Sequence, residues 1–193
     1  MAPEIEAALV LAAGRGRRMG VSKALLPHEG SFLLHRIARA YLDFGVRAVH
    51  AVVNDEVART LCEHPPLSGL FLHEGGDAEA PMMDSVLRAL SIASAEAFRA
   101  FFLQPVDSGP PSLGVLRQLQ VALADGLVVK PTYHGQGGHP LAFTQEAGRR
   151  IRDLKGESLR ARLRELEAHA VVRVEVDDQK VLRNWNAPED LAE

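Results

Sequence analysis

Short apolar runs alternate with longer segments of helical periodicity along this chain, and this alternation is what most restricts its fold. Seven runs rich in Val, Leu and Phe have the length of buried strands, at residues 8–12, 48–53, 70–73, 100–103, 127–130, 141–143 and 171–176. Alternating strands and helices are typical of a mainly parallel sheet that helices cover on both faces. We therefore predict an α/β fold, arranged as a three-layer α/β/α sandwich.

The segments between these runs carry apolar stripes of the kind that pack a helix onto a sheet. In residues 33–42 the apolar side chains recur at helical spacing, and Gly45 follows as a left-handed C-cap. The same stripe recurs in three later segments, at residues 82–90, 115–123 and 159–166. Ser158 is a candidate N-cap for the last of them. We expect these apolar side chains, Met82 among them, to lie in the core.

Length and charge limit the classes of function that the chain can have. Its 193 residues, of which 47% are hydrophobic, suit one compact domain over residues 1–193. With 22 Lys and Arg against 25 Asp and Glu, the net charge of -3 provides no broad positive field for nucleic acid or for an anionic membrane. Any anion site must therefore be local.

The N-terminal segment and the cysteine content indicate a cytoplasmic protein. Residues 1–6 are acidic where a secretory signal is basic, and the apolar run at 7–13 is too short to cross a bilayer. Cys62 is the only cysteine, which excludes an internal disulfide and a cysteine metal cluster. We expect Cys62 to fill space in the core.

The loop after the first apolar run concentrates glycine and basic residues. Residues 11–27 read LAAGRGRRMGVSKALLP, with three glycines, three arginines and a lysine between Gly14 and Lys23. Glycine backbone brings N–H groups close to phosphate oxygens, and the cations neutralise a triphosphate. The segment lacks the Gly-Lys-Ser/Thr of a P-loop, and Met19 stands where a dinucleotide-binding motif has its last glycine. In an open α/β sheet, ligands bind at such strand ends.

Residues 11–27 closely resemble the signature of the nucleotidyltransferases that include molybdenum cofactor cytidylyltransferase and the sugar-phosphate nucleotidyltransferases. That signature is Leu-Ala-Ala-Gly-x-Gly-x-Arg-Met-Gly-x-x-Lys-x-Leu-Leu-Pro, and the resemblance implies the Rossmann-like nucleotide-diphospho-sugar transferase fold. It implies nucleotide contacts at Ala13, Gly14, Arg15 and Gly16. It also implies two catalytic cations, Arg18 on the outer phosphates and Lys23 on the α-phosphate.

Two later segments match the family positions that hold a metal ion. Residues 104–111 read QPVDSGPP after a predicted strand. From composition alone Asp107 is more often a turn or capping residue, but the resemblance makes it a metal ligand. Residues 184–191 read NWNAPEDL, similar to the family's closing Asp/Asn-Thr-Pro-Glu-Asp-Leu, and this match makes Asn186 the second ligand. The implied metal is Mg2+, and the neutral amide leaves the site one negative charge short of an Asp pair.

Three further segments resemble the base and acceptor regions of the molybdenum cofactor enzymes. Ser85 falls where the family has a serine near the base, although Pro81 replaces a common glycine. Residues 137–143 read GGHPLAF and are similar to the Gly-His-Pro stretch on the acceptor side. His139 is therefore a candidate acceptor contact, with a loop-ordering hydrogen bond as the alternative role. Residues 155–160 resemble the glycine-arginine stretch that follows.

The resemblance implies a Mg2+-dependent nucleotidyltransferase, which moves a nucleoside monophosphate from a nucleoside triphosphate (NTP) to a phosphorylated acceptor and releases pyrophosphate. The Leu-Ala-Ala-Gly motif, Ser22 before Lys23 and the Gly-His-Pro segment favour CTP and molybdopterin over GTP. Three alternatives stay open. The acceptor is a sugar-1-phosphate or another small phosphorylated alcohol, the chain is a nucleotide-binding regulator without turnover, or it is a dinucleotide-dependent oxidoreductase.

Overall fold

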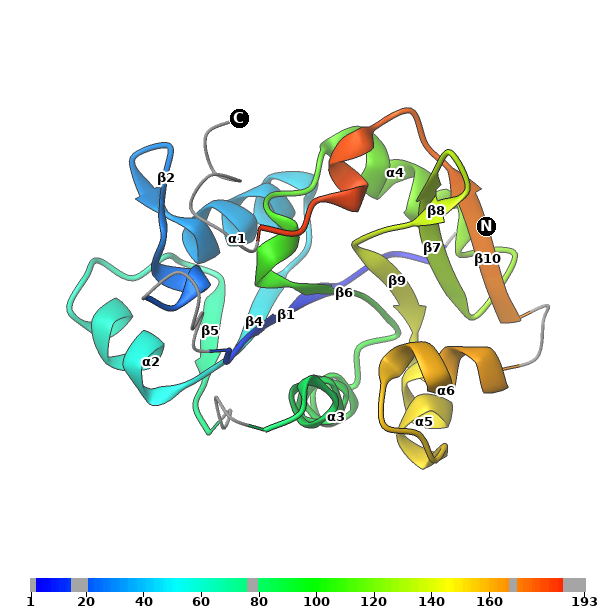
Figure 1. The fold of residues 1–193 in the computed structure, drawn as a ribbon, viewed down its shortest axis with the longest axis horizontal. Helices are drawn as coiled ribbons and strands as arrows, with labels where there is room; N and C mark the ends of the chain where they lie inside the picture. Colours follow the sequence, from blue (N-terminus) through cyan, green and yellow to red (C-terminus); the bar gives the residue numbers. More distant parts are fainter. Residues whose placement is uncertain (1–2, 15–20, 76–79, 167–169, 186–193) are drawn as a thin grey trace.

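The computed structural model describes residues 3–14, 21–75, 80–166 and 170–185 of the chain (Figure 1). Its main sheet contains β1 (Ala7–Ala12), β4 (Ala48–Val53), β5 (Leu70–His73), β6 (Ala100–Pro105), β7 (Val128–Tyr133), β8 (Gln136–Gly137), β9 (Leu141–Thr144) and β10 (Val171–Glu175). These eight strands lie in the order β10, β7, β9, β6, β1, β4 and β5, with β8 paired to β7. Two short strands, β2 (Pro27–His28) and β3 (Ser31–Phe32), form a separate antiparallel ribbon.

The main sheet is mainly parallel, which confirms the predicted fold class. Strand β1 pairs in parallel with β4 and β6, β4 pairs in parallel with β5, and β7 with β10. Strand β9 runs antiparallel to both β6 and β7, and β8 runs antiparallel to β7. The carboxyl ends of β1, β4 and β6 therefore meet at one edge of the sheet, where open α/β sheets bind ligands.

Helices cover both faces of the sheet. They are α1 (Leu33–Phe44), α2 (Asp55–Cys62), α3 (Met82–Ala95), α4 (Leu113–Ala122), α5 (Gln145–Asp153) and α6 (Leu159–Glu165). Three short 3-10 turns matter for the site: η1 (Lys23–Leu25), η2 (Val106–Ser108) and η4 (Gln179–Leu182). Buried side chains of α1, α2 and α4 form one core cluster, and those of α3 and α5 form the other. In Figure 1, α1 and α4 lie above the strands, and α3 and α5 lie below them.

Strand β1 explains why two helical layers are needed. Its side chains alternate between the two clusters, with Ala8 and Val10 on the α1 side and Ala7 and Leu9 on the α3 side. All four are completely buried. Burying a side chain of the size of Leu9 contributes about 1.5–3 kcal/mol to the free energy of folding. A strand that is apolar on both faces gains this energy only when both faces are covered.

The predicted helix signals appear in the structure. Gly45 has φ 112° and donates its N–H to the carbonyls of Tyr41 and Leu42, so it is the C-cap that ends α1. The Ser158 side chain accepts the N–H of Ala161 at the start of α6. The sequence pattern did not define α5, because only a narrow apolar stripe interrupts its polar residues.

Two expectations about the core are wrong. Met82 is 61% exposed, because it is the first residue of α3 and precedes the turns that pack on the sheet. Cys62 is also exposed, since α2 buries Val57, Ala58 and Leu61 and ends at the cysteine. Neither side chain fills the core.

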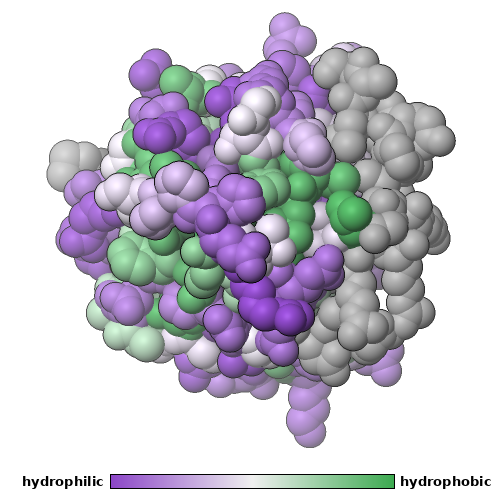
Figure 2. Space-filling view, turned by 90° about the vertical axis from the view of Figure 1, so that its left-hand side faces the viewer, coloured by the Kyte–Doolittle hydropathy of each residue, from purple (hydrophilic) through white to green (hydrophobic). Residues whose placement is uncertain are grey.

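The polarity of the surface and the length of the helices bear on how the chain relates to a membrane. Figure 2 shows one face of the molecule, on which hydrophilic side chains surround smaller apolar areas. Among the described residues, no helix has both the length and the apolar character needed to cross a membrane.

Candidate active site

Two charged side chains meet at the carboxyl edge of the sheet. The Nζ of Lys23 lies 3.0 Å from the Oδ2 of Asp107, and the side chains are 16% and 19% exposed. Each therefore keeps access to solvent while most of it is shielded. A cation and a carboxylate in this setting interact more strongly than an exposed pair, since less water screens them.

The strand register explains how these residues meet. Lys23 belongs to η1, which follows the β1 loop, and Asp107 belongs to η2, directly after β6. Strands β1 and β6 are parallel neighbours, with Leu11 opposite Pro105 near their carboxyl ends. The two loops consequently leave the sheet at the same place.

The loop after β1 is held by two buried polar residues. The side-chain amide of Asn54 donates to the carbonyl of Ala13 at 2.8 Å, and its oxygen accepts the N–H of Val57 at 2.9 Å. The hydroxyl of Ser22 donates to the carbonyl of Gly14 at 3.3 Å. These bonds fix the backbone of Ala13 and Gly14 at the mouth of the site. Our sequence reasoning missed Asn54, although an asparagine before two acidic residues at a strand end is an N-cap signal.

The turn that carries Asp107 rests on a buried side-chain network. The hydroxyl of Tyr41 in α1 donates to the Oε1 of Gln104 at 2.6 Å. The Nε2 of Gln104 donates to the carbonyl of Gly109 at 3.0 Å, just beyond η2. Because Tyr41 and Gln104 are 0% and 1% exposed, water does not replace these bonds. Sequence patterns did not indicate Gln104, because the apolar run ends at residue 103 whereas β6 continues to Pro105.

Trp185 closes η2 from the C-terminal side. Its backbone N–H donates to the backbone carbonyl of Asp107 at 2.9 Å. Gly109 has φ 68°, and a Cβ there would lie 2.9 Å from the Trp185 ring, so this position needs glycine for both conformation and space. The last described residue of the chain thereby contacts the backbone of the candidate metal ligand.

His139 approaches Asp107 from the other half of the sheet. Its backbone N–H donates to the carbonyl of Val181 at 2.8 Å, and its ring Nδ1 is buried without a hydrogen-bond partner among the described residues. Burial lowers the pKa of His139 to about 4, the Asp107 carboxylate opposes this shift, and Lys130 adds to it. The imidazole is therefore neutral at pH 7, and it lies within electrostatic range of both charged groups.

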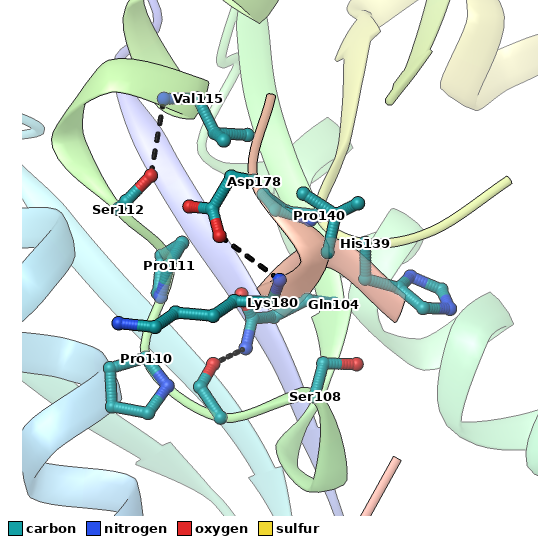
Figure 3. Close-up of a pocket in the computed structure, with 12 residues that line it drawn as sticks. Gln104, Ser108, Pro110, Pro111, Ser112, Val115, His139, Pro140, Asp178 and Lys180 are labelled. Atoms are coloured by element: carbon teal, nitrogen blue, oxygen red, sulfur yellow. Dashed lines mark hydrogen bonds between the residues drawn. The ribbon is translucent and has the colours of Figure 1, made fainter. Parts of the chain in front are cut away.

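A small pocket lies behind η2, between the start of α4 and η4 (Figure 3). Gln104, Ser108, Ser112 and Lys180 are among its lining residues. In Figure 3 the His139 ring extends away from the proline and serine side of the pocket. Neither Lys23 nor Asp107 lines this pocket, so it is separate from the place where the charged pair faces solvent.

The structure brings together part of the predicted site. Ala13, Gly14, Lys23 and Asp107 gather at the ends of β1 and β6. Ser85 lies in the first turn of α3 and makes no hydrogen bond to the charged pair among the described residues. The predicted Arg15, Gly16, Arg18 and Asn186 lie outside the described residues.

The described residues fit a magnesium ion that takes most of its ligands from a substrate. Within them no cluster of three or more His, Cys, Asp or Glu side chains could hold a metal. Asp107 supplies one carboxylate at a strand end, and its Oδ2 is shared with Lys23. Mg2+ commonly binds through one or two carboxylates together with phosphates and water, so a single described carboxylate suits it.

Comparisons with known proteins identify the family of this chain. Residues 8–173 match the family model of the MobA-like NTP transferase domain. The chain is 31% identical over 194 residues to the "Probable molybdenum cofactor guanylyltransferase" of Rhodopirellula baltica, which covers 95% of this chain and 88% of that protein.

Solved structures share the fold. A nucleotidyl transferase from Methanothermobacter thermautotroptrophicus has a TM-score of 0.79 at 22% identity and covers 98% of this chain and 95% of its own. The Rv0371C protein of Mycobacterium tuberculosis H37Rv, in complex with manganese, has a TM-score of 0.77 at 19% identity, covering 98% and 97%. By its family match and its curated relative, the chain belongs to the MobA-like NTP transferase family and is a nucleotidyltransferase.

Proposed function

We propose that this chain transfers a nucleoside monophosphate from an NTP to a phosphorylated acceptor and releases pyrophosphate. The Lys23–Asp107 pair is the observation that carries this proposal. Transfer of a nucleotidyl group requires a cation at the phosphate oxygens and a carboxylate for the metal that accompanies the triphosphate. The pair supplies one of each at the ligand-binding edge of the sheet.

The chemistry needs no covalent intermediate with the protein. An oxygen of the acceptor phosphate attacks the α-phosphorus, the bond to the β-phosphate breaks, and pyrophosphate leaves with the electron pair. Lys23 stabilises the charge that develops on the α-phosphoryl oxygens, and Arg18 neutralises the departing pyrophosphate. The backbone at Ala13 and Gly14, which Asn54 and Ser22 hold, orients the nucleotide for in-line attack.

Asp107 and Asn186 are the residues that we propose as holders of Mg2+. When bound, Mg2+ neutralises phosphate charge and polarises the reacting phosphoryl group. The Trp185 N–H on the Asp107 carbonyl supports this choice, because Asn186 is the next residue in the chain. The manganese complex of the M. tuberculosis neighbour is consistent with a divalent ion in this fold.

For the acceptor we propose molybdopterin. The Gly-His-Pro segment around His139 resembles that of the molybdenum cofactor enzymes, and the R. baltica relative is named as acting on molybdenum cofactor. The Nδ1 of His139 is buried and has no hydrogen-bond partner among the described residues, so this segment holds a polar atom whose partner the described part of the chain does not supply.

The donor base has two candidates. The Leu-Ala-Ala-Gly motif, Ser22 before Lys23 and the Gly-His-Pro segment favour CTP, and we propose CTP on these grounds. The name of the R. baltica relative favours GTP instead. Because Ser85 is the only described residue that we assign to the base, the choice depends on a direct comparison of the nucleotides.

The test is pyrophosphate release by the purified chain with Mg2+, each of the four NTPs, and either molybdopterin or a sugar-1-phosphate. We expect release with molybdopterin that depends on both Mg2+ and the acceptor. Release only with a sugar-1-phosphate would assign a different acceptor to the same chemistry. Nucleotide binding without release from any acceptor would favour a non-catalytic regulator.

A further inference from the structure

Lys130 lies on β7 in an unusual setting for a lysine. Its side chain is half-buried, and its ammonium end lies against the backbone of Gly137 on the neighbouring β8. A Cβ at Gly137 would collide with the Cε and Nζ atoms of Lys130. Gly137 is exposed and does not have a positive φ, and the atoms that a Cβ would meet are the end of a flexible side chain. The contact therefore shows that the Lys130 ammonium lies beside β8, and it does not require glycine at this position.

The surroundings of Lys130 are positively charged. Its register partner on β10 is Arg173, and Arg160 of α6 also lies within electrostatic range. Burial, Arg173 and Arg160 together lower the pKa of Lys130 from its usual value. Among the described residues, no carboxylate forms an ion pair with Lys130.

The acidic residue on the same face is already engaged. Glu175 on β10 lies opposite Thr132 on β7, two residues along the strands from the Lys130–Arg173 pair. One carboxylate oxygen of Glu175 accepts the Thr132 hydroxyl at 2.7 Å, and the other accepts the His134 N–H at 2.6 Å. Glu175 is therefore held at the end of the strand. Partly burying a cation beside two others costs free energy unless an anion joins them.

The position of Lys130 relates it to the active site. In the strand order, β7 lies on the β9 side of β6, whereas β1 with its glycine and basic loop lies on the opposite side. His139, two residues beyond Gly137, is influenced by the charges of both Asp107 and Lys130. The basic group of β7 therefore lies on the His139 side of Asp107, away from the loop that we assign to the triphosphate.

We propose that Lys130, with Arg173 and Arg160, forms a second anion site that holds a phosphate group of the acceptor. The inference rests on the proposed function, because a nucleotidyltransferase with a phosphorylated acceptor must hold two phosphorylated substrates at once. Three cations around one phosphate provide charge-assisted hydrogen bonds, and the two guanidinium groups can bind oxygens in pairs. The β1 loop holds the donor, and the β7–β10 cluster holds the acceptor.

Inorganic phosphate is the first probe, because it reports on the site without turnover. In ¹⁵N NMR spectra of the intact chain, phosphate should shift the amide signals of Thr132, Gly137 and Arg173 separately from those of Gly14 and Lys23. Lys130→Met, which keeps an unbranched side chain one atom shorter and removes the charge, should weaken the first set of shifts at least tenfold and leave the second set unchanged. Arg117→Gln, an exposed arginine of α4, is the matched control.

Phosphate shifts in the wild-type chain that are confined to the β1 loop would overturn the proposal, as would equal shifts near β7 in Lys130→Met. Arg173→Gln, at an exposed position, should also weaken the β7 shifts and serves if Lys130→Met does not fold. These outcomes are independent of whether any acceptor is turned over.

The second readout is kinetic. Lys130→Met should raise the KM for the phosphorylated acceptor at least tenfold, with the KM for the NTP within twofold of wild type. Arg117→Gln should change neither constant. An effect on the NTP KM alone would contradict an acceptor site. Absence of turnover in wild type with every acceptor would count against the proposed function, and the phosphate shifts would still decide the role of Lys130.

Discussion

The ammonium of Lys23 and the carboxylate of Asp107 lie 3.0 Å apart although 84 positions separate them in the chain. Parallel pairing of β1 with β6 brings their loops to the same edge, and neither side chain is fully buried. Both groups are therefore partly accessible in the described part of the chain, as a site for a phosphate and a metal ion requires. This arrangement places a cation for phosphate and a carboxylate for a metal ion side by side in a protein whose net charge is -3.

Replacing the lysine should reduce chemistry more than folding. Lys23→Ala is expected to lower kcat for pyrophosphate release at least tenfold, since removal of one such contact to a transition state commonly costs about 100- to 1,000-fold. The change is at the edge of the sheet, so the circular dichroism spectrum should match wild type. Arg117→Ala, at an exposed position of α4, controls for loss of a basic side chain. Unaltered release by folded Lys23→Ala would exclude the catalytic role.

The Tyr41–Gln104 bond should matter for both stability and activity. Tyr41→Phe leaves the Oε1 of Gln104 buried without this donor, which should lower the free energy of unfolding by about 1–3 kcal/mol. Because Gln104 also holds Gly109 beyond the Asp107 turn, kcat should fall as well. Urea titrations and initial rates measure the two effects. Tyr133→Phe is the control, and an equal effect of both changes would argue against the network.

The sequence predicts the sheet better than it predicts the supports of the site. All seven long strands are visible as apolar runs, and the central strands β1 and β4 are buried on both faces, whereas the edge strands β5 and β10 are only partly buried. The apolar stripe and Gly45 define α1. The Lys23 and Asp107 positions could be assigned only through resemblance to a family motif. Gln104 and Asn54 escaped prediction because their importance depends on partners in α1 and in the β1 loop, 63 and 41 positions away.

Position in an element also limits what a periodic pattern can predict. Met82 matches the helical stripe but lies at the first residue of α3, and Cys62 lies at the last residue of α2. Helix periodicity gives the face of a residue and says nothing of whether that turn reaches the sheet. Similarly, nothing in the sequence around Lys130 indicates that Gly137 will lie against its ammonium.

A histidine pair in β4 and β5 should contribute to a loss of stability in mild acid, in addition to the buried His139. The Nδ1 of His50 lies 2.9 Å from the Nε2 of His73. Burial is the main cause that lowers the pKa of both residues below 6.5. The charge of His73 lowers the pKa of His50 further, and Arg88 lowers that of His73. Glu96 opposes both shifts. The unfolded chain therefore binds protons first as the pH drops below about 6.5, which weakens folding by about 1.4 kcal/mol for each unit of pKa difference.

The measurement is the urea midpoint at pH 7.5 and pH 5.5. His73→Gln should reduce the difference between the two midpoints, because it removes one titrating partner and relieves the other. His134→Asn, at an exposed position with φ 49° that asparagine accepts, is the control. A midpoint difference in His73→Gln as large as that of wild type would refute this assignment.

The chain should discriminate strongly between the bases of the donor nucleotide. A pocket that hydrogen-bonds one base leaves buried polar groups unpaired when another base enters, so discrimination between bases is large. We predict that kcat/KM for CTP exceeds that for GTP at least tenfold with molybdopterin as the acceptor. Parallel initial-rate measurements with the two nucleotides test this. Preference for GTP would align the chain with its R. baltica relative and overturn the base assignment, while the nucleotidyltransferase chemistry would stand.

The most direct test of the account is the initial rate of Mg2+-dependent pyrophosphate release by Asp107→Asn, measured beside Asp125→Asn. Asp125 is exposed after α4, so it controls for the chemical change without touching the site. We predict that Asp107→Asn lowers the rate at least 100-fold at saturating Mg2+ and NTP, in the range expected for loss of one electrostatic contact to the reacting group. Asp125→Asn should retain the wild-type rate. A rate for folded Asp107→Asn equal to that of Asp125→Asn would contradict the assignment of the Lys23–Asp107 pair as the catalytic centre.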